Sequence, residues 1–418
     1  MMAFGYPKNF FHMNEATVRF LGVWLPSKKH HILIRLLHPF YFIFVYSTLI
    51  YFVIGQYMKV EMKNVTTIIS SLAVLLTTHA GHVKGSLVVF GGRRIQEIKD
   101  ILQDVNYQYY PVGEVNPGST FQKEKTFYTM LSYALLVGFM MPGASGTVTT
   151  ASRLMIEMKG NNTFESIDKN CNDFITYTFY VPIFIETKWE CIISSSLMYS
   201  GMTMYEGIAH AAHDGLLAGL LICLKTQLLI LGDIFRTLRQ RVLSRLNIPE
   251  DYSVIHDEEN PALEEEMYRQ LCLCTEHLKI LLTARDKIEK TFTYMLLMQT
   301  IASFPVFASS LYAASQTPLS STDFYTNIDF FGCVLVQLAM FCWFGNGITE
   351  AGEAIRSALY EGDWYSCSPR FKKSMILTMT RMQRPVYLSI GRFSPLTITT
   401  LVSVCQGSFS YFTLFKSL

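Results

Sequence analysis

The chain has 418 residues, of which 50% are apolar, 14% aromatic and only 16% charged, whereas an ordinary soluble domain has roughly 25% charged residues. This composition excludes a disordered chain and most soluble enzymes. The formal net charge is +2, from 35 Lys and Arg against 33 Asp and Glu, which excludes the basic excess of a nucleic-acid-binding protein. Nine cysteines are too few for a disulfide scaffold.

Apolar windows predict the fold class. A bilayer core about 30 Å thick needs about 20 mostly apolar residues per helix, and seven stretches of the sequence satisfy this need. The chain is therefore expected to be an all-α polytopic membrane protein with seven transmembrane helices. The fourth stretch is too long for one crossing, and we interpret it as a single helix whose inner half leaves the lipid. The windows are 39–57, 66–90, 127–150, 189–235, 292–314, 328–348 and 396–415.

The positions of lysine and arginine predict the orientation, because cytoplasmic loops retain them. With the N-terminus inside, 26 of the 35 basic residues fall in cytoplasmic segments and 7 in extracellular ones. We therefore expect a cytoplasmic N-terminus and an extracellular C-terminus. The first forty residues lack the pattern of a cleavable signal peptide, so the N-terminus is expected to be retained.

The spans and the charge bias together divide the chain. Residues 262–282 carry a one-sided apolar stripe at helical spacing, which indicates a cytoplasmic helical bundle continuous with the later spans. Leu263, Met267, Leu271, Cys274, Leu278 and Leu281 form that stripe. The expected segments are a cytoplasmic N-terminal segment 1–38; helices one to four in 39–231, with an extracellular loop 151–188; cytoplasmic anchor helices 232–291; helices five and six in 292–348; a cytoplasmic anchor segment 349–395; and the last helix with an extracellular C-terminus, 396–418.

The loop between the third and fourth windows carries two features of an extracellular segment. Asn161 begins an Asn-x-Thr sequon and is a candidate for glycosylation. Cys171 and Cys191 flank the same loop. By spacing alone they either pair as a disulfide in an oxidising compartment or stay as two buried thiols.

The last window carries a polar stripe. Its members recur every three or four residues, which places them on one face at about 100° per residue. Such a face in lipid needs hydrogen-bond partners or water, so it favours either helix packing through small hydroxyls or a water-filled conduction path. In the second interpretation, Leu414 is the candidate gate. The predicted pore-lining residues are Ser403, Gln406, Ser410, Thr413, Leu414 and Ser417.

The outer halves of the middle windows are rich in aromatic residues and methionines, with a few hydroxyls among them. Walls of this kind suit a small, volatile, apolar ligand, although ordinary helix packing explains any single residue equally well. The candidate pocket residues are Phe139, Met140, Met198, Tyr199, Met202, Thr203, Ser303, Phe304 and Phe307.

The sequence lacks the usual motifs of catalysis, among them a Walker loop, a nucleophile elbow and a zinc-protease helix. We therefore expect neither enzymatic activity nor a cofactor. Glu206, His210 and His213 share one helical face, and we interpret them as polar contacts at the inner membrane edge rather than as metal ligands. No metal site is predicted.

The last sixty residues resemble those of insect odorant receptors in residue type and order. The matching positions are Ala358, Tyr360, Trp364, Tyr365, Lys372, Lys373, Met379, Arg381, Gln383, Pro385, Gly391, Phe393, Pro395 and the run 410–414, Ser-Tyr-Phe-Thr-Leu. Chain length, topology and the retained N-terminus extend the resemblance over the whole chain. The loop between windows four and five is shorter than in the shared coreceptor Orco, so the chain resembles a ligand-tuning subunit.

The resemblance implies a function. Such receptors are heterotetrameric, ligand-gated, nonselective cation channels formed with Orco in the plasma membrane of olfactory neuron dendrites. The implied partners are therefore Orco, a small volatile apolar ligand, permeant cations and membrane lipid. The family's last helix lines the pore, its gate position falls on Leu414 and the next polar position on Ser417, where the coreceptor type has Val and Gln. The implied ligand pocket lies in the outer halves of helices two to six.

Two alternatives stay open at this stage. A gustatory-type receptor channel has the same topology, although its usual last-helix signature is not met between Thr400 and Phe415. A G-protein-coupled chemoreceptor has the opposite topology, and its Asp-Arg-Tyr and Asn-Pro-x-x-Tyr motifs do not close spans three and seven. The position of the C-terminus relative to the membrane discriminates between these two classes.

Overall fold

The computed structural model describes residues 5–23, 31–58, 65–157, 171–175, 185–249, 252 and 256–417. Helices form almost all of this part, as the apolar windows predict, and the all-α expectation is confirmed. The β-structure consists of strands β1 (Ser389–Ile390) and β2 (Ser394–Pro395), which pair antiparallel, and a bridge between Val112 and Val115.

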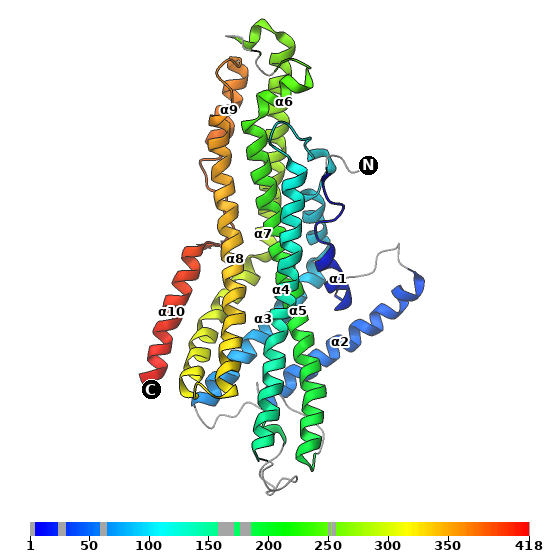
Figure 1. Cartoon of the computed structure of the whole chain (residues 1–418), viewed down its shortest axis with the longest axis vertical. Coiled ribbons are helices and arrows are strands. Elements are labelled where there is room, and N and C mark those ends of the chain that lie inside the picture. The colour runs from blue at the N-terminus through cyan, green and yellow to red at the C-terminus, as the bar shows by residue number, and fades with distance from the viewer. Residues whose placement is uncertain are drawn as a thin grey trace.

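Ten α-helices occur in the described residues, and Figure 1 shows their arrangement. Helices α4, α5, α7 and α8 run along the long axis of the molecule. Helices α6 and α9 lie at one end, while α2 and α10 diverge from the bundle. The helices are α1 (His12–Phe20), α2 (Ile32–Met58), α3 (Val65–Leu102), α4 (Pro117–Glu157), α5 (Lys188–Arg236), α6 (Leu238–Arg245), α7 (Pro261–Gln316), α8 (Thr322–Glu361), α9 (Pro369–Arg381) and α10 (Ile398–Ser417); short 3-10 turns cover Val105–Tyr107, Cys171–Asp173 and Asp257–Glu259.

Helix α5 is the core of the bundle. It begins at a capping box, in which the Thr187 side chain accepts a hydrogen bond from the Glu190 backbone and the Glu190 side chain accepts one from the Thr187 backbone. Every residue from Leu216 to Leu224 is buried. Gly219 lets α4 approach, because a Cβ there would lie 2.6 Å from the Tyr128 ring. The long fourth window is thus one continuous helix.

Within the described residues, α4, α5, α7 and α8 are long and apolar enough to cross a membrane. Each extends well beyond the roughly 20 residues that a bilayer core requires. The excess length of α5, α7 and α8 runs toward the end where α6 and α9 lie (Figure 1).

Helix α7 joins two elements that the apolar patterns predict separately, the stripe in 262–282 and the window 292–314. Its first half carries the predicted apolar stripe, and all six stripe residues are at most 2% exposed, so the predicted burial is confirmed. No helix-breaking residue separates this half from the apolar window 292–314, and the helix continues without interruption from Pro261 to Gln316.

A buried histidine ties α7 to the segment that follows α3. Nδ1 of His277 lies 3.0 Å from the Tyr109 hydroxyl, and the Tyr107 ring stacks on the imidazole with centroids 4.4 Å apart. Burial lowers the pKa of His277 to about 3, from an ordinary value of 6.5. The folded protein therefore keeps this imidazole neutral throughout the physiological pH range.

Acidification should consequently destabilise the fold through His277. Below about pH 6.5 the His277 imidazole is protonated in the unfolded chain. In the folded chain it stays neutral down to about pH 3. The free energy of unfolding should therefore fall as the pH falls, by about 1.4 kcal/mol per pH unit from this group well below its ordinary pKa. Thermal unfolding of the purified protein between pH 7.5 and 5 measures this, and His277→Phe should show a shallower fall. An identical pH dependence in both proteins would contradict the assignment.

The cysteine pair lies at the start of α5, at the end of the bundle opposite to α6 and α9 (Figure 1). Cys171 and Cys191 form a disulfide with their Cα atoms 5.5 Å apart. Leu154 of α4 and Ile175 pack around it, so the bond links the start of α5 to the segment before it within a small apolar cluster. The sequon residue Asn161 lies outside the described residues.

Candidate functional site

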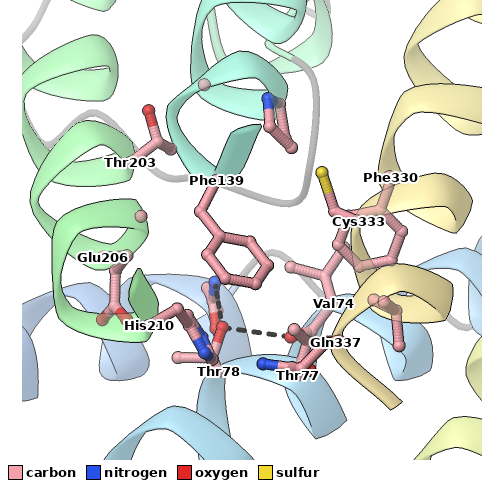
Figure 2. A pocket seen from close by; sticks show the side chains of 15 residues that line it. Val74, Thr77, Thr78, Phe139, Thr203, Glu206, His210, Phe330, Cys333 and Gln337 are labelled. Carbon is pink, nitrogen blue, oxygen red and sulfur yellow. Dashed lines mark hydrogen bonds between the residues drawn. The ribbon is translucent and has the colours of Figure 1, made fainter. Parts of the chain in front are cut away.

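A cavity of about 120 Å³ lies among helices α2, α3, α4, α5 and α8. Its walls are largely apolar, and Figure 2 shows Phe139 of α4 pointing into it, with α5 on one side and α8 on the other. The lining residues are Gln56, Val74, Thr77, Thr78, Phe139, Pro142, Gly143, Thr203, Glu206, Gly207, His210, Phe330, Cys333, Val334 and Gln337.

Close contact between α4 and α5 positions Phe139. A Cβ at Gly143 would lie 2.6 Å from the Thr203 hydroxyl oxygen, and one at Gly207 would lie 2.3 Å from the Phe139 carbonyl oxygen. Both distances are too short for any side chain. The two glycines therefore bring the helix backbones together and hold Phe139 at the cavity.

A buried polar network lies beside the cavity. Lys84 Nζ lies 2.8 Å from an Asp214 carboxylate oxygen, and both side chains are at most 1% exposed. The Gln337 amide donates a hydrogen bond to Asp214 and accepts one of 2.7 Å from the Gln299 amide. Because Gln337 also lines the cavity, the network connects the cavity to α3, α5 and α7.

The structure brings two of the nine predicted pocket residues, Phe139 and Thr203, to the cavity. Ser303 is buried and donates to its own helix at the Gln299 carbonyl, and Phe307 packs against Phe331 with ring centroids 5.3 Å apart. Met140 and Met202 are outside the lining, and Met202 packs near the disulfide. The side chains of Met198 and Tyr199 lie outside the described residues.

The polar lining residues Gln56, Glu206, His210 and Gln337 are absent from the predicted pocket set. Their signal in the sequence is a lone polar or ionisable side chain within an apolar window, which by default marks a functional position inside a membrane. Glu206 and His210 share a helical face as predicted. Within the described residues, no group of three or more His, Cys, Asp or Glu side chains is arranged to hold a metal ion.

Helix α10 presents its polar stripe away from the bundle. Ser403, Gln406, Ser410 and Thr413 are exposed, and Leu414 is 53% exposed. The Ser403 and Ser410 hydroxyls donate to carbonyls of their own helix, at 3.0 and 3.2 Å. The side chain of Ser417 lies outside the described residues. The polar face is therefore left uncovered within one chain.

The other face of α10 joins it to the bundle. Val404 and Ser408 are buried, and Gly407 receives the ring of Phe304 from α7, since a Cβ at Gly407 would lie 2.7 Å from that ring. Phe304, predicted as a pocket residue, thus contacts the last helix. Helix α7 also carries Gln299, whose amide donates a hydrogen bond to the cavity-lining residue Gln337.

Comparison with protein families gives a match to the model described as 7tm Odorant receptor over residues 64–409. Similar curated proteins include Odorant receptor 2a of Drosophila melanogaster, 28% identical over 157 residues, which are 37% of this chain and 39% of that protein. Odorant receptor Or2 of Anopheles gambiae is 32% identical over 83 residues, 20% of this chain and 22% of that protein. These alignments thus span well under half of the relatives' length.

Comparison with solved structures covers nearly the whole chain. The olfactory receptor OR5 from the insect Machilis hrabei in complex with eugenol is similar with a TM-score of 0.76 over 98% of this chain and 99% of that one, at 12% identity. The structure of OR5 described without eugenol is similar with a TM-score of 0.74 over 97% and 98%, at 11% identity. At these identities the likeness concerns the fold, that of a seven-helix membrane protein.

Proposed function

The chain belongs to the 7tm odorant receptor family, and from that membership we propose that it is the odorant-binding subunit of a heteromeric, ligand-gated, nonselective cation channel. It is a polytopic membrane receptor and not an enzyme. The proposal assigns ligand binding to the cavity beside Phe139, conduction to the uncovered face of α10 and the location to the plasma membrane. The second subunit type is the coreceptor Orco.

The uncovered polar face of α10 carries the proposal. Exposure of hydroxyl and amide groups to lipid is energetically unfavourable. The exposed stripe includes Ser403, Gln406 and Ser410. Assembly of several chains around one axis turns these side chains into stacked polar rings that water and cations fill. Leu414 then forms an apolar ring that restricts the path.

The cavity supports ligand binding. Its volume of about 120 Å³ approaches that of an engineered apolar cavity of roughly 150 Å³ that binds benzene. Most of the wall surface is apolar, with a few polar groups among it, as in sites for small lipophilic molecules. A volatile molecule that reaches the membrane interior is the ligand that fits this description.

A packed route links the two sites. Gln337 at the cavity contacts Gln299 of α7, and Phe304 of the same helix contacts Gly407 of α10. In the proposed mechanism, the ligand favours an arrangement of α7 and α8 that moves α10 outward and widens the ring at Leu414. The ligand needs only a higher affinity for the open state than for the closed state.

Whole-cell recording tests this function. Cells expressing the chain with Orco, Orco alone or the chain alone are exposed to volatile esters, alcohols, aldehydes and amines, with and without a block of G-protein signalling. The expected result is a fast cation current that reverses near 0 mV and has a ligand response specific to the pair. A response that disappears with the G-protein block would instead support a G-protein-coupled receptor.

Antibody labelling of a C-terminal tag on intact cells provides an independent test of topology. The proposed channel places the end of α10 outside the cell, because the basic residues before it are cytoplasmic. A tag that is accessible only after permeabilisation would contradict the proposed orientation.

A further inference from the structure

The cavity's hydrogen-bonding groups indicate what kind of polar group its ligand carries. The cavity is small, and Figure 2 shows Glu206 and His210 of α5 on one side of it and Phe330 and Cys333 of α8 on the other. Several of its donors already have partners. Thr77 and Thr78 donate to carbonyls of their own helix, at 2.9 and 3.0 Å, the Gln56 amide donates to Thr78 at 3.2 Å, and the Cys333 thiol donates to the Gly138 carbonyl.

Three buried polar atoms of the lining have no hydrogen-bond partner among the described residues. They are Oε1 of Gln56, Oε1 of Glu206 and Nδ1 of His210. The first is an acceptor, the second is an acceptor when the carboxyl is ionised, and the third accepts when the imidazole proton sits on Nε2. A buried polar group without a hydrogen-bond partner is unfavourable. These three atoms are therefore unused acceptors, and a ligand that donates several hydrogen bonds would satisfy them.

Glu206 lacks a lysine or arginine as a counter-charge in the cavity. The lining contains neither residue type, and the nearby Lys84 is already paired with Asp214. An adjoining groove of about 230 Å³ shares Phe139 and Cys333 with the cavity and is lined by a second carboxylate, Asp329. A buried carboxylate without a counter-charge is strongly unfavourable. A cationic ligand group would supply that charge.

We propose that the cavity is a site for a small apolar amine whose ammonium group donates hydrogen bonds to Glu206, Gln56 and His210. An ammonium has three donors and no acceptor, which matches the three unpartnered atoms, whereas a hydroxyl has one donor and an aldehyde or ester has none. Phe139, Val334 and Phe330 contact the apolar part. The cavity volume limits that part to about the size of a benzene ring or a five-carbon chain. This inference rests on the proposed odorant-gated channel.

Three ligands of matched length test the inference: pentylamine, pentan-1-ol and pentanal, applied to cells that express the chain with Orco. We expect pentylamine to have the lowest half-maximal concentration and pentanal the highest. Glu206→Gln keeps the side-chain shape but removes the charge. It should raise the half-maximal concentration for pentylamine about ten- to a hundredfold, the usual range for a charge-assisted hydrogen bond, and change that for pentan-1-ol by less.

Two further variants make the test specific. Gln56→Met removes one acceptor and should raise the pentylamine value about three- to tenfold. Glu353→Gln removes a carboxylate from an exposed position of α8 and should leave all three values unchanged. Surface labelling confirms that each variant reaches the plasma membrane, so a loss of response is separated from a loss of folding.

The outcomes separate this inference from the proposed function. Currents evoked by alcohols or aldehydes but not by amines, or an amine response that Glu206→Gln leaves unchanged, would overturn the amine site and leave the odorant-gated channel standing. Cells with confirmed surface assembly that respond to no volatile of any class would overturn both proposals.

Discussion

Replacing Lys84 by methionine should destabilise the protein more than any surface substitution. The ammonium lies 2.8 Å from Asp214 and both side chains are at most 1% exposed. Methionine has a similar length but leaves the Asp214 carboxylate buried without its counter-charge. Removal of one partner of a buried ion pair typically costs about 3–5 kcal/mol, a large part of the stability of an ordinary domain. The expected result is a strong loss of surface expression and a lower midpoint of thermal unfolding.

The double variant Lys84→Met with Asp214→Leu separates charge burial from packing. Replacing both charges by apolar side chains removes the uncompensated carboxylate, and such replacements of whole pairs are often neutral for stability. The double variant should therefore recover much of the loss. Lys123→Met, at an exposed position of α4, should change stability by about 0.5 kcal/mol or less. A single variant as stable as the starting protein would contradict the buried pair.

The same pair affects the proposed ligand response. Asp214 accepts a hydrogen bond from Gln337, which lines the cavity and accepts one from Gln299 of α7. Loss of Lys84 thus disturbs the side chain that connects the cavity to α7. In the double variant, Gln337 loses its acceptor and is free to turn toward the cavity. Any channels that this variant forms should therefore show altered ligand sensitivity even where folding recovers.

Much of the fold follows from local patterns in the sequence. The apolar windows predict where helices run, because a helix in lipid satisfies its own backbone groups. The stripe from Leu263 to Leu281 predicts burial, because one-sided apolar periodicity requires a partner surface. The extent of α7 was not predicted. A hydropathy window ends where charges begin, at Lys287 and Lys290, but such residues are good helix formers, and the helix passes through them.

The site was less predictable than the fold. Phe139 was found because an aromatic residue at the right depth is a reasonable pocket candidate, yet Phe304 and Phe307 meet the same criterion and pack against α10 and α8 instead. Which side of a helix faces a cavity depends on rotation between helices, and here the glycines at 143 and 207 set it. Hydropathy does not encode such rotation. Isolated polar residues such as Gln56 and Glu206 were the better signal.

The environment of the last helix could not be predicted from its periodicity. Its polar stripe was equally compatible with helix packing and with a pore, because periodicity specifies a face but not its environment. One chain leaves that face uncovered, with Gln406 and Ser410 exposed, while Val404 and Ser408 on the other side are buried. Packing against the remainder of the same chain is thereby excluded for the described residues of the stripe. A contact with other chains or with water in a pore satisfies the exposed groups.

Leu414→Ala should raise the resting current of the channel several-fold. In the proposed assembly, a ring of Leu414 side chains closes the path by excluding water from a narrow apolar constriction. Alanine widens the ring and shortens its apolar surface, so that water and cations enter without ligand. Leu414 is 53% exposed in the single chain, so its truncation should cost little folding stability. Whole-cell current before and during ligand application, together with surface labelling, measures both effects.

A matched truncation on the same helix shows whether the effect belongs to the stripe. Ile398 is 38% exposed and points about 60° away from the nearest member of the polar stripe at about 100° per residue, so Ile398→Ala should leave the resting current unchanged. The ratio of evoked to resting current should therefore fall in Leu414→Ala alone. Equal currents in Leu414→Ala and the starting channel, at equal surface density, would move the gate away from Leu414. Because Ser410 and Thr413 lie on the same face, an altered cation permeability with a normal resting current would instead place Leu414 in the pore lining but not at its narrowest point.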